Sequence, residues 1–149
     1  MLESNAAERW QRLMDETVLE VFAAMLGCEC VPTEPAGAPS DNTARVRFSG
    51  ALVGECLLLF AAADAAKLAH MFLGEAADDE MAIDAIGELC NVLAGGWKRR
   101  LRPPASGAGL SVPSSAFGTP DSRGDLRQCY QFEGAQFAVR LTVKRVKED

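Results

Sequence analysis

The sequence has few residues that could act as a catalytic base, and it has little positive charge. Only one histidine, His70, occurs among the 149 residues. It stands in an apolar stretch beside Met71 and Phe72, where a histidine of the core or the surface is far commoner than a catalytic one. The single histidine therefore argues against hydrolases of the Ser-His-Asp and Cys-His types.

Basic residues are scarce in comparison with acidic ones. The chain has 15 Lys and Arg against 21 Asp and Glu, which gives a net charge of -6 at pH 7. A surface that binds nucleic acid needs a basic field to attract phosphates. We therefore expect no nucleic-acid partner.

Long apolar runs are missing as well. No stretch approaches the roughly 18 apolar residues that a transmembrane helix needs, and the start, Met1 to Asn5, shows no basic segment followed by an apolar core. We therefore expect a cytoplasmic protein with no membrane partner. A chain of 149 residues can bury most of its apolar surface in one core, so we expect a single domain over residues 1–149.

The cysteines form an odd set without a metal-binding pattern. Cys56 and Cys90 lie in apolar runs, where a thiol behaves as a small hydrophobic group. The pair Cys28 and Cys30 could form a redox or metal element, but it lacks a second pair or a nearby histidine at ligand spacing. We therefore expect reduced, structural cysteines and no metal site in this chain.

A stretch in the middle of the chain carries polar residues in a helical pattern. Steps of four, three and four residues keep side chains within one narrow stripe of a helix, at about 100° per residue. Four residues follow those steps: Asp84, Glu88, Asn91 and Gly95. The other side of this helix is apolar at the spacing of a core-facing helix, and comprises Ile83, Ile86, Cys90, Leu93, Trp97 and Leu101. The polar stripe is either an ordinary solvated face, which is the commoner case, or a functional site.

Gly95 is the member of the stripe that a solvated face explains least well. A glycine inside a helix costs about 1 kcal/mol relative to alanine and exposes backbone. We therefore expect another group to approach the helix closely at Gly95.

Apolar periodicity and turn residues predict the secondary structure. Helices are expected over Glu8–Leu26, from a cap at Asp64 through Leu73, and from the acidic turn at Asp78 to about Leu101. Strands are expected over Ala44–Ser49, Leu52–Phe60, Val112–Phe117, Leu126–Phe132 and Gln136–Val146, with Val31–Thr43 as an irregular connection. Four basic residues crowd the end of the third helix: Lys98, Arg99, Arg100 and Arg102. They either stabilise the helix dipole or steer an acidic partner.

The two halves of the chain resemble each other. The segment from Arg47 to Ala51 precedes one apolar strand as the segment from Gln131 to Ala135 precedes another. Aligning Gly27 with Gly95 places Glu16 on Asp84, Glu20 on Glu88 and Ala23 on Asn91. This repeat predicts a pseudo-two-fold α+β domain, mainly an antiparallel sheet with long helices packed on one face, with one intact site and one degenerate site.

The polar stripe and a later loop resemble a family signature. The CheX/CheC/FliY family of chemotaxis phosphatases has an Asp or Ser, a Glu four residues on, an Asn three residues further, and a Pro in the loop or strand after the helix. The matching positions here are Asp84, Glu88, Asn91, Gly95-Gly96, Leu110-Ser111-Val112-Pro113 and Gly118. The resemblance covers most of the chain and implies a CheC-like fold. A single motif in mid-chain is more similar to CheX than to CheC or FliY, which carry two.

The resemblance implies a phosphatase that hydrolyses the aspartyl phosphate of a CheY-type response regulator. Glu88 and Asn91 would be the catalytic residues: Asn91 holds the attacking water, and Glu88 pairs with a cation of the partner. Gly95 and Pro113 would contact the partner, and Asp84 makes either a secondary polar contact or a helix-end charge. No cofactor is expected to be bound by this chain, because Mg²⁺ belongs to the response regulator.

Two further expectations concern partners. A non-catalytic response-regulator-binding or flagellar-switch-like module would keep the same fold, but retention of both Glu88 and Asn91 favours the enzyme. We also expect a homodimer, because the long strand Gln136–Val146 would pair with a second copy if it lay at a sheet edge.

Overall fold

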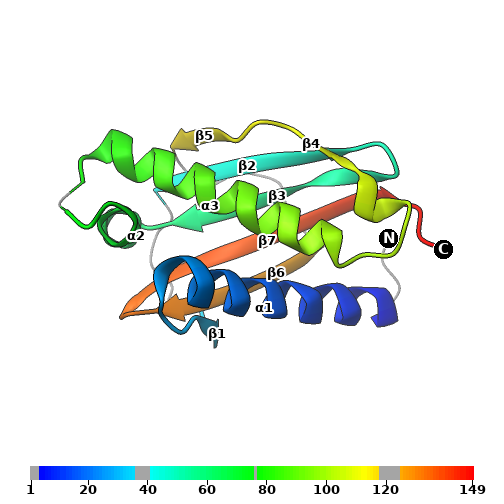
Figure 1. Ribbon diagram of the computed structural model, residues 1–149, viewed down its shortest axis with the longest axis horizontal. Coiled ribbons are helices and arrows are strands. Elements are labelled where there is room, and N and C mark those ends of the chain that lie inside the picture. The colour runs from blue at the N-terminus through cyan, green and yellow to red at the C-terminus, as the bar shows by residue number, and fades with distance from the viewer. Residues whose placement is uncertain (1–3, 36–40, 76, 118–124) are drawn as a thin grey trace.

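A layer of helices lies against one face of an antiparallel sheet (Figure 1). The computed structural model describes residues 4–35, 41–75, 77–117 and 125–149. The helices are α1 (Ser4–Leu26), α2 (Ala62–Leu73), α3 (Asp79–Arg99) and the short 3₁₀ helix η1 (Ala105–Gly107). The strands are β1 (Val31–Thr33), β2 (Asn42–Ser49), β3 (Leu52–Phe60), β4 (Gly109–Leu110), β5 (Ser114–Phe117), β6 (Leu126–Phe132) and β7 (Ala135–Val146). The predicted α+β fold, with long helices on one face, is confirmed.

The sheet is built from two halves that exchange their first strands. Its order is β1-β6-β7-β3-β2-β4, and β5 also pairs with β2. The first half runs α1-β1-β2-β3 and the second runs α3-β4-β5-β6-β7, joined by α2. β1 of the first half pairs with β6 of the second, whereas β4 and β5 pair with β2, and β3 and β7 meet at the centre. This topology is the pseudo-two-fold arrangement that the sequence repeat predicts.

Each long helix covers one half of the sheet. α3 contacts β2 and β3, and α1 contacts β1 and β6 (Figure 1). Phe137 lies at the centre of an aromatic cluster between sheet and helices, with ring centroids 5.0 Å from Phe60 and 5.6 Å from Phe22. All three rings are buried. None of the helices in the described part of the chain is long and apolar enough to cross a membrane.

α1 and α3 touch each other through small residues and a tryptophan pair. The Trp97 Nε1–H group donates a hydrogen bond of 3.0 Å to the Trp10 carbonyl oxygen, and the two rings meet edge to face. Near this point Gly96 faces Thr17, and a Cβ atom at Gly96 would lie only 2.8 Å from Thr17 Cγ2. The two helices can approach this closely because Gly96 has no side chain.

Several element boundaries differ from the sequence predictions. α2 begins after Ala61, so Asp64 lies in its first turn and is not its cap. The connection predicted as irregular contains β1. The strand predicted over Val112–Phe117 begins two residues later, as β5, and the short strand β4 that precedes it was not predicted. β7 is paired on both sides, with β3 and with β6, so it is not the sheet edge that the dimer argument required.

Candidate functional site

α3 is fixed at its beginning by a side-chain cap. Asp78 has an extended backbone, and its carboxylate accepts a 2.8 Å hydrogen bond from the Met81 backbone N–H. Asp79 and Glu80 follow in the first turn, where negative charge interacts favourably with the helix dipole. Ile86, Leu93 and most of the other predicted apolar positions are buried, as the periodicity indicated. The orientation of the helix about its axis is therefore determined by its apolar side.

The polar stripe of α3 opens away from the sheet. Asp84 and Glu88 are exposed, and Asn91 is half-buried. Within the described residues, no hydrogen bond or ion pair engages the side chains of Asp84, Glu88 or Asn91. Glu88 and Asn91 stand about one turn apart on the same face. The stripe thus presents a carboxylate and a carboxamide whose polar atoms are available to another molecule.

The segment from Leu110 to Pro113 forms one flank of this stripe. A Cβ atom at Gly87 would lie 3.4 Å from Pro113 Cβ, and one at Gly95 would lie 3.5 Å from Leu110 Cδ1. The two glycines are eight residues apart, which is about 12 Å along a helix. The segment therefore touches α3 at two points, about one turn before and one turn after Asn91.

Gly95 has a different role from the one expected. It is buried, and the group beside it is Leu110 of the same chain. The closest approach to the helix occurs one residue later, at Gly96, where α1 crosses. The especially close approach expected at Gly95 is therefore absent there, since its contact with Leu110 is an ordinary one, and contact of Gly95 with a partner stays a prediction. Pro113, in contrast, is exposed on the flank of the stripe.

The first half has no matching pair of free polar groups. Glu20, the counterpart of Glu88 in the repeat, forms an ion pair with Arg100, and Ala23 stands where the second half has Asn91. Gly27 lies just beyond α1 with φ +64°, whereas Gly95 is inside α3, so the aligned glycines are not structural equivalents. The residue-by-residue alignment of the two helices, and with it the assignment of one intact and one degenerate site, therefore stays a prediction.

Two of the four basic side chains near the end of α3, those of Lys98 and Arg100, make local hydrogen bonds. Lys98 Nζ donates a 2.8 Å hydrogen bond to the Ser106 carbonyl oxygen, and Arg100 donates one of 3.1 Å to the Gly96 carbonyl oxygen. The Arg102 backbone N–H donates to the Glu148 carboxylate. Arg99 is exposed. These contacts support the helix-end interpretation of the cluster.

Two of the buried cysteines have raised thiol pKa values. All five are free. A hydrogen bond with Cys56 and burial raise the pKa of the Cys90 thiol, and burial raises the pKa of Cys30. Such thiols stay protonated and are poor nucleophiles. Within the described part of the chain, no three His, Cys, Asp or Glu side chains gather as a metal site would require.

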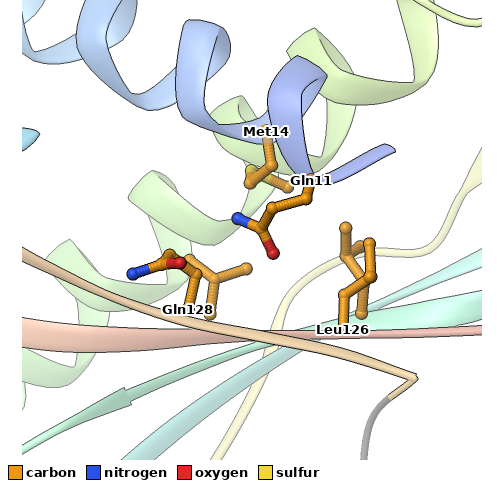
Figure 2. A pocket seen from close by; sticks show the side chains of 6 residues that line it. Gln11, Met14, Leu126 and Gln128 are labelled. Carbon is orange, nitrogen blue, oxygen red and sulfur yellow. The ribbon is translucent and has the colours of Figure 1, made fainter. Parts of the chain in front are cut away.

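A recess beneath α1 is a packing gap. Gln11 and Met14 of α1 face Leu126 and Gln128 of β6 across it (Figure 2). The recess has no room for a water molecule, and it belongs to the half of the fold opposite the polar stripe. It is therefore a weak candidate for a substrate site.

The chemistry available at the stripe is limited to binding and orientation. A carboxamide accepts through its oxygen and donates through its nitrogen, but it is neither a base nor a nucleophile. A carboxylate can bind a cation of another molecule. Such a pair suits a reaction in which the substrate is already activated and a water needs to be positioned.

Comparison with known proteins gives a family. A family model described as "Chemotaxis phosphatase CheX" matches residues 42–131, more than half of the chain. The matched range includes Asp84, Glu88, Asn91 and Pro113; Gly118, also part of the predicted signature, lies outside the described residues. No curated protein sequence matches the chain significantly.

Solved structures share the fold at low sequence identity. The CheX protein of Vibrio vulnificus is 21% identical with a TM-score of 0.74, covering 95% of this chain and 100% of that one. A CheX protein of Borrelia burgdorferi, solved as a complex with CheY, BeF₃ and Mg²⁺, is 16% identical with a TM-score of 0.69, covering 91% and 98%. FliY of Thermotoga maritima is 14% identical with a TM-score of 0.68, covering 97% and 92%. From the extent of the family match, the chain belongs to the CheX family of chemotaxis phosphatases.

Proposed function

We propose that this chain hydrolyses the aspartyl phosphate of a CheY-type response regulator, with Glu88 and Asn91 completing an active site on the partner. The observation that carries the proposal is the open stripe of α3. A carboxylate and a carboxamide lie one turn apart there, and no described residue engages their polar atoms. Family membership and the similar CheX structure solved with CheY support the choice of partner.

Asn91 positions the attacking water in this proposal. An acyl phosphate is already activated, and phosphoryl transfer passes through a loose transition state in which orientation and charge stabilisation supply most of the acceleration. The Asn91 carboxamide oxygen accepts a hydrogen bond from the water. The water oxygen bonds to phosphorus as the bond from phosphorus to the aspartyl oxygen breaks. The products are inorganic phosphate and the regulator's free carboxylate.

Glu88 orients the complex. Its carboxylate pairs with a cationic group of the regulator and so holds α3 over the phosphoryl group. Asp84, one turn earlier on the same face and exposed, adds a further polar contact. Pro113 contacts the regulator from the flank. We assign Mg²⁺ to the regulator, where it neutralises charge on the phosphoryl oxygens.

We also propose that the chain self-associates, but through an edge of the sheet other than β7. β7 lies inside the sheet, so a second copy would pair along β1 or along β4 and β5, the outer strands among the described residues. The molar mass of the protein in solution tests whether the chain self-associates.

The experiment that tests the phosphatase is a comparison of phosphate release. The phosphorylated regulator from the same cell is mixed with wild-type protein or Asn91→Ala at fixed Mg²⁺. We expect acceleration by the wild type and a loss of at least about 100-fold in kcat for Asn91→Ala, because a positioning group typically contributes about that much. Leu19→Ala, at an exposed site on α1, is the control. No acceleration by the wild type with any cognate regulator would move the chain to the non-catalytic binding module.

A further inference from the structure

Val112 is the most exposed large hydrophobic residue of the described chain. Its side chain is 83% exposed, whereas the next most exposed large hydrophobics, Leu19 and Leu73, reach 49%. A single apolar side chain on a surface needs no explanation by itself. Val112, however, lies beside the polar stripe of α3.

The position of Val112 follows from the two contacts of its segment with α3. The side chain of Leu110 reaches Gly95, and Pro113 lies against Gly87. Val112 falls between these points, and Asn91 is the α3 residue midway between the same two glycines. The segment that carries Val112 therefore borders the stripe between its contacts one turn before and one turn after Asn91. A partner large enough to cover the stripe would also meet Val112.

The segment that carries Val112 is held firmly to the sheet. Ser111 and Arg47 exchange two hydrogen bonds of 2.9 Å: the Ser111 N–H donates to the Arg47 carbonyl oxygen, and the Arg47 N–H donates to the Ser111 hydroxyl oxygen. β4 and β5 pair with β2 on either side of this link. A β-branched valine also has few rotamers. Presentation of this side chain to a partner would lose little conformational entropy.

We propose that Val112 is an apolar docking residue that inserts against the surface beside the phosphorylated aspartate of the response regulator, and that it determines affinity and not chemistry. This inference rests on the proposed function, because the regulator is its occupant. Burial of a valine side chain corresponds to about a tenfold change in affinity. A charged residue at the same position would also leave an unpaired charge in the interface.

The test separates binding from turnover. The dissociation constant is measured against the cognate regulator loaded with beryllofluoride and Mg²⁺, and kcat and KM are measured against the phosphorylated form. We expect Val112→Asp to raise the dissociation constant and KM at least tenfold with kcat unchanged at saturation, and Val112→Ile to retain affinity. Leu19→Asp is the matched control, since Leu19 lines a different surface with Ala23, Gly27 and Glu29.

The outcomes distinguish the two proposals. If the wild type releases no phosphate but Val112→Asp still weakens binding, the phosphatase is wrong and the docking role stands. If the wild type is active and Val112→Asp binds within about twofold of wild type, the docking role is wrong. An unchanged dissociation constant with altered mass in solution would assign Val112 to contact with a second copy of this chain, and would also overturn the proposal.

Discussion

Two neighbouring glycines of α3 should respond in opposite directions to the same substitution. A Cβ atom at Gly96 would lie 2.8 Å from Thr17 Cγ2, about 0.7 Å inside the normal separation of roughly 3.5 Å between carbon atoms. At Gly95 the nearest atom, Leu110 Cδ1, would lie at 3.5 Å, an ordinary contact. Alanine is more favourable than glycine in a helix by up to about 1 kcal/mol. Gly95→Ala should therefore be neutral or stabilising by up to that amount.

Gly96→Ala should destabilise because Thr17 cannot move away freely. Thr17 is buried, and its hydroxyl donates a 2.6 Å hydrogen bond to the Leu13 carbonyl oxygen, so rotation of the methyl group would break that bond. Overpacking of this kind costs about 1–3 kcal/mol, offset by the gain in helix propensity. The two alanine variants should differ by about 1–3 kcal/mol in the free energy of unfolding, with Gly96→Ala the less stable.

A second substitution tests the cause. Thr17→Ser removes the clashing methyl group and keeps the hydroxyl, and in the wild type it should cost about 1 kcal/mol for the lost buried methyl. In the Gly96→Ala background it should be neutral or stabilising, which gives a coupling energy of at least about 1 kcal/mol. Urea unfolding measures all four proteins, with unchanged m values as the check on comparability. Additive effects within about 0.5 kcal/mol would refute the proposed contact.

The remaining predictions concern the C-terminal residues and the sheet. Glu148 is partly buried, which raises its pKa, but the ion pair with Arg9 and the Arg102 N–H outweigh this and lower the pKa overall. A carboxylate whose pKa is lower in the native state contributes stability above its unfolded pKa, and this stability is lost as the pH falls through the native pKa. Glu148→Gln should therefore lower the free energy of unfolding by about 1.5 kcal/mol at pH 7 and by almost nothing at about pH 2. Urea unfolding at the two pH values measures both differences, and equal differences would contradict the prediction. Gly54→Ala should cost about 3 kcal/mol or more, because its Cβ would lie 2.0 Å from the Thr142 carbonyl oxygen. Gly107→Ala is the control, since a Cβ atom there meets no atom within 4 Å and Gly107 has no positive φ. Thermal midpoints of the two variants that lie close together would contradict the prediction.

Local patterns predicted the parts of the fold that depend on nearby residues. The apolar spacing of α3 predicted its buried side, and the strands predicted over Leu126–Phe132 and Gln136–Val146 correspond to β6 and β7. The repeat between the halves gave the pseudo-two-fold arrangement. The first two features follow from neighbours in sequence, and the third follows from comparing the two halves of the same chain.

The structural features that the sequence did not predict depend on contacts between residues far apart in the chain. β1 is three residues long and contains Pro32, so nothing in its sequence indicates a strand until β6 pairs with it. The interior position of β7 depends on the pairing with β3, across more than 70 residues of chain. Gly95 drew attention as the glycine of the stripe, but the closer packing is at Gly96, and its cause is Thr17 on another helix.

In the candidate site, too, local spacing predicted one part and tertiary contacts determine the other. The spacing of Asp84, Glu88 and Asn91 was sufficient to place them on one face. The flank could not be found from spacing, because Leu110 and Pro113 reach α3 only after β4 and β5 pair with β2. Gly87 was the available signal: a second glycine inside the helix, four residues before Asn91, indicates a neighbour on that side.

The exchange of first strands between the halves makes each half depend on the other to close its edge. A chain cut between α2 and α3 would give one fragment with β2 lacking β4 and β5, and another with β6 lacking β1. Each fragment would have an unpaired sheet edge, which is a template for pairing with another chain, and each carries the strand that the other lacks. The two fragments should therefore reassemble from separate solutions into one native-like particle, and the intact chain should fold late in its outer strands, after both halves have formed.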